Sequence, residues 1–136
     1  MKPKKNGRPA RAKQKKEKYR ILLLDEDSHS RLLHQHCFRK TGAELIAVKS
    51  VFGLLRQLLR NQPDLIILEY HLRGRNYYSL ISCVKTLACH VPLVVQSTQG
   101  LEENRQKCAE LGCDAYFVKP LDWRRYLQKV MELLDC

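Results

Sequence analysis

The sequence has no C-x-x-C pair, no long uncharged apolar run and almost no acidic residues near its start. Its six cysteines are irregularly spaced, which is typical of reduced thiols in the cytoplasm and excludes a secreted disulfide framework. No apolar run approaches the ~18 residues that a membrane span needs. The first apolar run, residues 21–24, leads directly into Asp25-Glu26-Asp27. We therefore expect a cytoplasmic protein without a signal peptide or membrane span.

Positive charge is abundant but unevenly distributed. The chain has 136 residues and a formal net charge of +11. Residues 1–20 hold ten Lys/Arg and one acid, Glu17, which gives +9 and leaves +2 for residues 21–136. A body that binds nucleic acid over its whole surface is therefore excluded. The hydrophobic content of 44% is sufficient for one folded domain. We predict a disordered basic arm over residues 1–19 and one domain over residues 20–136.

Short apolar runs alternate with segments of helical periodicity along this domain. Strands are expected at residues 21–24, 45–48, 64–68, 92–96 and 115–118, and helices at residues 28–40, 51–59, 78–87, 102–111 and 123–134. The continuous apolar runs are typical of a parallel sheet that is covered on both faces. Ser28 is expected to cap the first helix, and Gly42 and Gly112 to follow helix ends. The pattern predicts a doubly wound α/β domain with a five-stranded parallel sheet and five helices.

Polar residues follow four of the predicted strands, where ligands bind in such sheets. They are Asp25-Glu26-Asp27, Glu69, Ser97-Thr98 and Lys119-Pro120. Carboxylates brought together repel one another unless a cation lies between them, and either a divalent metal or Lys119 could supply that charge. The alternative is that each acid only begins a loop or caps the next helix.

Four stretches, ILLLDED, PDLIILEYHLRG, VPLVVQST and GCDAYFVKP, resemble in order and spacing the receiver domain of response regulators in two-component signalling. The resemblance covers residues 20–135 and implies a flavodoxin-like fold with strand order 2-1-3-4-5. By position it implies three Mg²⁺ ligands, which are Asp25, Glu26 and the main-chain carbonyl of His71. It also implies three residues that contact or sense a phosphoryl group, which are Ser97, Tyr116 and Lys119.

Glu69 departs from the family pattern, because the resemblance implies a phosphoacceptor Asp at this position. The added methylene moves the carboxylate oxygens by about 1.5 Å. A misplacement of about 1 Å can slow a reaction on the order of 10²-fold. We expect Glu69 to pair with Lys119 and Mg²⁺ binding to be weakened or lost. Three interpretations remain open: an active-like conformation held by Glu69, a docking module without a switch, and a receiver still phosphorylated on Glu69.

The segment after the third predicted strand is basic and rich in tyrosine. Arg73 and Arg75 precede Tyr77 and Tyr78, and both tyrosines are expected to be exposed. The segment is either a solvated charged loop or a surface for a partner. The histidines give little indication of a site, since His34 and His36 lie two apart on one helix and cannot share a face.

The basic arm offers a second kind of function. Its Gly7-Arg8-Pro9 core is similar to the AT-hook that binds narrow A·T minor grooves, although Asn6 stands where the fuller motif has Arg. The residues expected to contact DNA or RNA are Arg8, Arg11, Lys13, Lys15 and Lys16. A general polycation without sequence preference is the alternative.

Two functions therefore compete. The first is a single-domain receiver-like protein in phosphorelay signalling that contacts a kinase or a downstream protein. The second is a regulator that binds nucleic acid through its arm, while the domain mediates assembly. A metal-dependent phosphatase is disfavoured because no second nucleophile or Gly-rich phosphate loop is found, so we expect no enzyme activity. The oligomeric state is left open.

Overall fold

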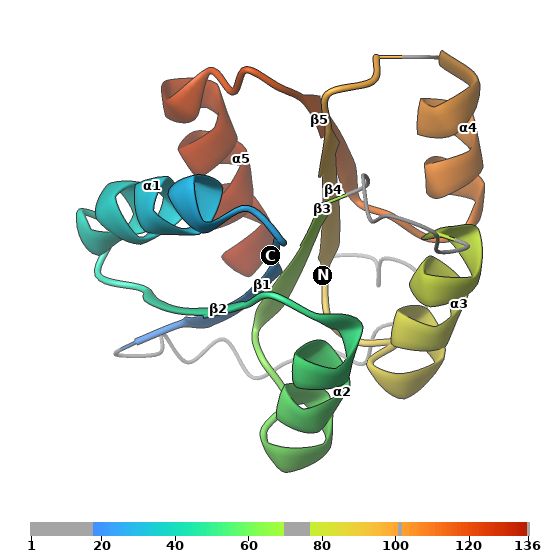
Figure 1. Cartoon of the computed structure of the whole chain (residues 1–136), viewed down its shortest axis with the longest axis horizontal. Helices are drawn as coiled ribbons and strands as arrows, with labels where there is room; N and C mark the ends of the chain where they lie inside the picture. The colour runs from blue at the N-terminus through green and yellow to red at the C-terminus, as the bar shows by residue number, and fades with distance from the viewer. Residues whose placement is uncertain (1–17, 70–76, 101, 136) are drawn as a thin grey trace, which may run out of the picture.

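The computed structural model describes residues 18–69, 77–100 and 102–135, and strands and helices alternate along them (Figure 1). The strands are β1 (Arg20–Leu24), β2 (Glu44–Val48), β3 (Leu65–Glu69), β4 (Leu93–Ser97) and β5 (Ala115–Val118). The helices are α1 (Ser28–Arg39), α2 (Val51–Arg60), α3 (Tyr77–Leu87), α4 (Glu102–Glu110) and α5 (Trp123–Leu134). Every predicted element is present, with bounds that differ by at most one residue from those expected.

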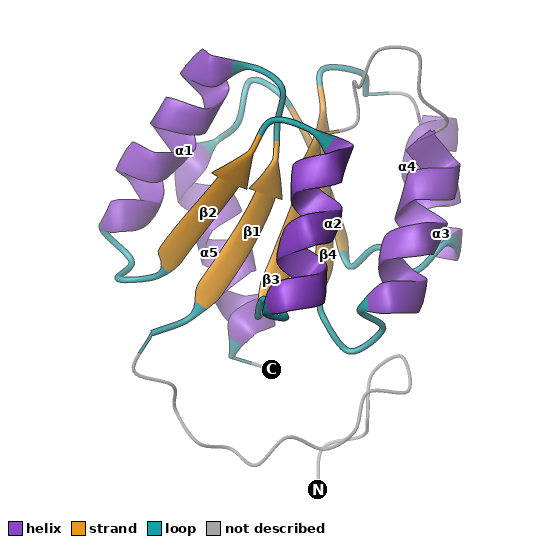
Figure 2. Cartoon of the chain, turned by 60° about the horizontal axis from the view of Figure 1, so that its bottom comes forward, coloured by secondary structure: helices purple, strands orange, loops and turns teal. Residues whose placement is uncertain are grey.

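The strands form one parallel sheet in the order β2-β1-β3-β4-β5. Helices α1 and α5 cover one face, and α2, α3 and α4 cover the other (Figures 1 and 2). The predicted flavodoxin-like fold is therefore confirmed. Of the helices in the described part of the chain, none has the length and apolar composition needed to cross a lipid bilayer.

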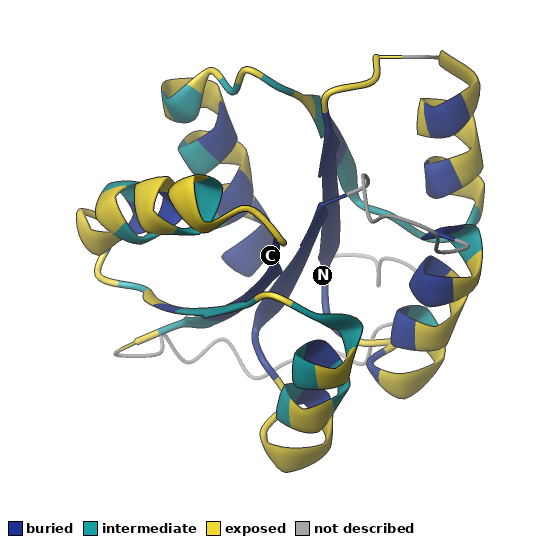
Figure 3. Ribbon diagram, in the orientation of Figure 1, coloured by how far each residue is buried: buried dark blue, intermediate teal, exposed yellow. Residues whose placement is uncertain are grey.

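Two apolar cores lie on the two faces of the sheet, and the buried strands separate them (Figure 3). Because successive strand residues point to opposite faces, each central strand supplies both cores. On β1, Ile21 and Leu23 belong to the core under α1 and α5, whereas Leu22 and Leu24 belong to the core under α2, α3 and α4. This alternation also fixes the face on which each polar residue at a strand end lies.

Asp27, and not Ser28, caps α1. Its backbone is extended, with φ −84° and ψ 120°, and its side chain accepts a hydrogen bond from the backbone N–H of His29 at 3.1 Å. Ser28 is already the first helical residue, so our assignment of the cap was wrong by one position. The glycines expected after helix ends are confirmed, because Gly42 and Gly112 have φ of 79° and 103°, a region that favours residues without a Cβ atom.

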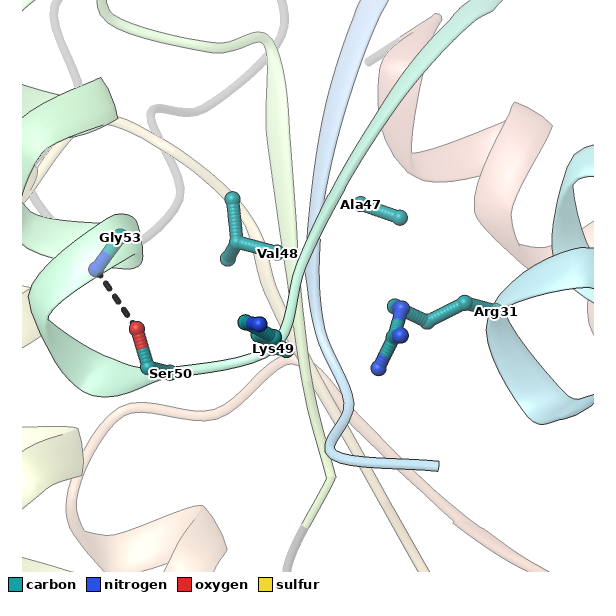
Figure 4. A pocket seen from close by; sticks show the side chains of 6 residues that line it. All are labelled: Arg31, Ala47, Val48, Lys49, Ser50 and Gly53. Carbon is teal, nitrogen blue, oxygen red and sulfur yellow. Dashed lines mark hydrogen bonds between the residues drawn. The ribbon is translucent and has the colours of Figure 1, made fainter. Parts of the chain in front are cut away.

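Ser50 caps α2 beside a shallow surface hollow of about 390 Å³ (Figure 4). Its Oγ accepts the backbone N–H of Gly53 at 3.1 Å. Replacing Ser50 with alanine should lower the free energy of unfolding by about 1 kcal/mol, because a helix-end donor loses its partner. Urea unfolding of Ser50→Ala, with Ser50→Asp as a variant that keeps the cap, measures this. A Ser50→Ala protein as stable as wild type would contradict it.

Tyr77 and Tyr78 were expected to be exposed, and this expectation was wrong. Both belong to the first turn of α3. Tyr77 is buried, and its hydroxyl donates to the carbonyl of Leu68 at 3.1 Å. The half-buried Tyr78 donates to Oδ1 of Asn104 at 2.8 Å, which joins α3 to α4. Both hydroxyl groups donate to acceptors within the domain, as buried tyrosine hydroxyls usually do.

Candidate functional site

Four polar residues meet at the carboxyl edge of the sheet, under α1 and α5. They are Asp25, Glu69, Gln96 and Lys119, and each lies two positions beyond a member of the core on that face. Since side chains repeat every second residue on a strand, all four point to the same side. The register adds proximity, because Glu69 and Gln96 are directly paired on β3 and β4.

The ammonium group of Lys119 lies between two buried carboxylates. Its Nζ is 2.6 Å from Oε2 of Glu69 and 3.5 Å from Oδ2 of Asp25. The Glu69 and Asp25 side chains are only 7% and 1% exposed, and that of Lys119 is 20% exposed. The contact with Glu69 has the short distance of a charge-assisted hydrogen bond. The expected pairing of Glu69 with Lys119 is therefore present in this geometry.

The pKa shifts of this pair have opposing causes. Burial raises the pKa of the Glu69 carboxyl, and the hydrogen bond and charge of Lys119 oppose that rise. Burial alone would lower the pKa of Lys119, but the hydrogen bond and charge of Glu69, together with Asp25, raise it above its ordinary value. Lys119 is therefore a cation at neutral pH, and it compensates the negative charge that the fold buries beside it.

Both carboxylate oxygens of Asp25 contact groups of the same chain. Its Oδ1 accepts the backbone N–H of Asp27 at 3.0 Å, and its Oδ2 accepts the hydroxyl of Ser30 and faces Lys119. Arg31 donates to the backbone carbonyls of Asp25 and Glu26 at 2.9 and 3.0 Å. The Glu26 residue is exposed, so the predicted acid pair divides into one inner and one outer carboxylate.

Lys119 is the cation that lies between the Asp25 and Glu69 carboxylates. Within residues 18–69, 77–100 and 102–135, no group of three His, Cys, Asp or Glu side chains could hold a metal ion. His71, the third predicted ligand, lies outside the described residues.

Ser97 and Tyr116 meet at a second point, around the backbone of Gln99. The buried Ser97 accepts the backbone N–H of Gln99 at 3.0 Å through Oγ. The hydroxyl of Tyr116 donates to the carbonyl of Gln99 at 2.9 Å, and the residue is 8% exposed. The guanidinium of Arg105 lies 5.1 Å from the centroid of the Tyr116 ring. The backbone N–H of Lys119 donates to the carbonyl of Ser97 at 2.8 Å, which connects this point to the ion pair.

Three residues of the site, Ser30, His34 and Gln96, were not predicted from the sequence. Ser30 accepts a hydrogen bond from Lys119 at 3.2 Å. His34 and Gln96 are buried and contact each other behind Glu69. Gln96 could have been found, since it is a polar residue inside the apolar run of β4. His34 could not, because only the packing of α1 on the sheet places it there.

The residues predicted to bind nucleic acid lie outside the described part of the chain. They are Arg8, Arg11, Lys13, Lys15 and Lys16. The described domain begins at Lys18 and carries the candidate site at the carboxyl edge of its sheet.

Comparison with known proteins identifies a family for the domain. The family model for the response regulator receiver domain matches residues 21–131. The transcriptional regulatory protein PrrA of Mycobacterium tuberculosis is 27% identical over 115 residues, which are 85% of this chain and 49% of PrrA. The probable transcriptional regulator ycf29 of Guillardia theta is 28% identical over 108 residues, 79% of this chain and 49% of ycf29. The chain thus spans about half the length of these relatives.

Solved structures share the fold at lower sequence identity. A response regulator from Thermotoga maritima superposes with a TM-score of 0.81 at 18% identity, covering 88% of this chain and 99% of that one. The receiver domain of the sensor histidine kinase PA1611 from Pseudomonas aeruginosa superposes with a TM-score of 0.76 at 18% identity, covering 87% and 98%. That structure holds a magnesium ion coordinated in its active-site cleft.

Proposed function

The chain belongs to the response regulator receiver domain family. From this premise we propose that it is an atypical receiver, in which Glu69 takes the place of a phosphoryl group as the partner of Lys119. The observation that carries the proposal is the 2.6 Å contact between Lys119 and Glu69. In the family, the corresponding lysine contacts the phosphoryl group that is carried by an aspartate. Here the longer carboxylate reaches that lysine directly.

The same contact opposes phosphoryl uptake. Phosphoryl transfer depends almost entirely on positioning and charge neutralisation. The extra methylene of Glu69 displaces its nucleophilic oxygens by about 1.5 Å, and Oε2 is already bonded to an ammonium group. Lys119, placed between Glu69 and Asp25, also supports weakened Mg²⁺ binding. Intact-mass measurement after incubation with acetyl phosphate and Mg²⁺, for wild type and Glu69→Asp, tests this proposal.

An active-like conformation is better supported than a docking module without a switch. Tyr116 is buried, and its hydroxyl holds the loop after β4 through Gln99. Arg105 of α4 stacks over the ring and donates to the Tyr116 carbonyl at 3.1 Å. Tyr116 and Arg105 therefore connect β5, α4 and the loop after β4. Lys119, which pairs with Glu69, is hydrogen-bonded through its backbone N–H to Ser97 before that loop. We infer that the domain signals without enzyme activity, through contacts of the α4 and β5 surface with a kinase or a downstream protein.

The basic arm supports a second activity, nucleic-acid binding, because residues 1–19 hold nine of the 25 Lys/Arg in the chain. We expect the affinity for a DNA duplex to fall with salt, the log-log slope being about −0.9 per phosphate contacted. Fluorescence anisotropy at several salt concentrations, for the full chain and for a chain lacking residues 1–19, measures this. Equal affinity of the two chains would reject a role of the arm.

A further inference from the structure

Gln96 is a fully buried polar residue that the pairing of Glu69 with Lys119 does not by itself require. It lies on β4 directly opposite Glu69, with 0% of its surface exposed. Its Nε2 is 3.5 Å from Oε2 of Glu69 and 3.1 Å from Nε2 of His34. Its Oε1 accepts the hydroxyl of Tyr126 at 2.7 Å. Buried amides retained in a core need such partners, so the side chain is held from three sides.

The hydrogen bonds around His34 define the orientation of the Gln96 amide. Nδ1 of His34 is 2.7 Å from the backbone carbonyl of Ser30. A carbonyl only accepts, so Nδ1 carries the proton, and Nε2 of the neutral ring is an acceptor. Gln96 therefore presents its NH₂ group to His34 and its carbonyl oxygen to Tyr126, which donates to it.

The opposite orientation of the amide is disfavoured on two sides. Its oxygen would then face the lone pair of His34 and the carboxylate of Glu69, whereas the Tyr126 hydroxyl can rotate and accept from an NH₂ group. Buried groups left without a partner destabilise a fold strongly. Burial also lowers the pKa of His34 and so favours the neutral ring, although the bond from the ring to the Ser30 carbonyl acts in the opposite direction. The donor that faces Glu69 is thus fixed by His34 of α1, and the amide also contacts Tyr126 of α5.

These contacts form a closed ring through the site. Lys119 bonds to Glu69 and to the hydroxyl of Ser30. The carbonyl of Ser30 accepts from His34, and Gln96 joins His34 back to Glu69. The ring includes residues of α1, β3 and β4 and the residue after β5, and Tyr126 adds α5.

We propose that Gln96 is a positioning residue that His34 and Tyr126 orient, and that its amide holds the Glu69 carboxylate on Lys119. This inference rests on the proposed function, because it explains how the contact that replaces a phosphoryl group is kept in place. Through His34 and Tyr126, α1 and α5 would then help to position the Glu69 carboxylate, although neither helix supplies an acid or a cation to the ion pair.

The test uses the ammonium group of Lys119 as its probe. In ¹H–¹⁵N spectra of the full chain, a paired ammonium that is largely shielded from water exchanges its protons slowly, so a distinct Lys119 signal is expected. Gln96→Met and Tyr126→Phe should speed this exchange about threefold to tenfold, since a net hydrogen bond is worth roughly that factor. Phe38→Leu is the matched control, because Phe38 packs on both His34 and Tyr126 but makes no hydrogen bond in the ring. It should leave the exchange unchanged.

The ring tautomer of His34 gives an independent readout. Its ¹⁵N shifts should report a neutral ring protonated at Nδ1 in wild type, with an Nε2 shift that moves in Gln96→Met. If Gln96→Met does not fold, Tyr126→Phe, which removes one hydroxyl, still decides the question.

The outcomes separate the two claims. A wild type without a protected Lys119 signal would overturn the proposed function. A protected signal that Gln96→Met and Tyr126→Phe leave unchanged, or that the Phe38→Leu control alters equally, would overturn only the positioning role. A neutral His34 protonated at Nε2 would also overturn the positioning role of Gln96.

Discussion

Replacing Glu69 with aspartate is expected to give a protein that takes up one phosphoryl group from acetyl phosphate and Mg²⁺, at least about 10²-fold faster than wild type. In wild type the Glu69 carboxylate contacts Lys119 at 2.6 Å, and the shorter aspartate side chain withdraws the carboxylate from this contact. The released ammonium can then face an incoming phosphoryl group, and the nucleophilic oxygens return to an in-line position. Intact-mass spectrometry over a time course measures the uptake.

Glu69→Gln is the matched control for this prediction, since it keeps the length of the side chain and removes the nucleophile. Neither Glu69→Gln nor wild type should gain the mass of a phosphoryl group over the same time course. A stable phosphorylated wild-type protein would show that Glu69 is still an acceptor. An inert Glu69→Asp protein, if folded, would show that the other residues of the site have also lost the capacity for transfer.

Replacing Lys119 with methionine is expected to lower the free energy of unfolding by about 3 kcal/mol at neutral pH. The change leaves Glu69 and Asp25, which are nearly inaccessible to water, without a compensating cation. Removing one partner of a buried ion pair has effects of this size, and the 20% exposure of Lys119 favours the lower end of the range. Urea unfolding followed by circular dichroism measures it.

A double-mutant cycle isolates the pair. Glu69→Gln removes the carboxylate charge, so Lys119→Met should be much less harmful in the Glu69→Gln background, with a coupling of about 2 kcal/mol. Additive effects of the two substitutions would mean that the contact contributes no net stability.

The pH dependence of the Lys119→Met effect has a definite sign. The folded-state pKa of Lys119 is raised above its ordinary 10.5. Its stabilisation is therefore fully present below pH 10.5 and is lost as the pH rises through the higher folded-state pKa. The difference in stability between wild type and Lys119→Met should shrink at strongly alkaline pH, whereas the titration of tyrosines affects both proteins alike.

The sequence predicted the fold and the ion pair because both follow from short-range regularities. Continuous apolar runs separated by helical segments specify a parallel sheet covered on both faces. Parallel strands end at one edge of the sheet and residues two apart on a strand share a face, so Asp25, Glu69 and Lys119 lie together. The departure at Glu69 could be recognised because its neighbours along the sheet edge matched the family.

The parts that the sequence did not predict depend on packing between elements distant in the chain. His34 contacts Ser30 within α1, but its acceptor role arises because α1 lies against β4 and α5. Tyr77 and Tyr78 follow a basic segment, and nothing in the local sequence pattern predicts their burial. Their hydroxyl groups nevertheless donate to the Leu68 carbonyl and to Asn104. Such contacts require the three-dimensional arrangement that places the acceptors.

The most direct test of the central claim is the ¹H–¹⁵N amide spectrum of wild type and Glu69→Asp before and after addition of Mg²⁺ and acetyl phosphate. If Glu69 already holds Lys119, the amides of Ser97, Tyr116 and Lys119 should keep their positions in wild type and move in Glu69→Asp. If the same amides move in wild type as in Glu69→Asp, the site responds to phosphorylation and Glu69 does not hold it closed.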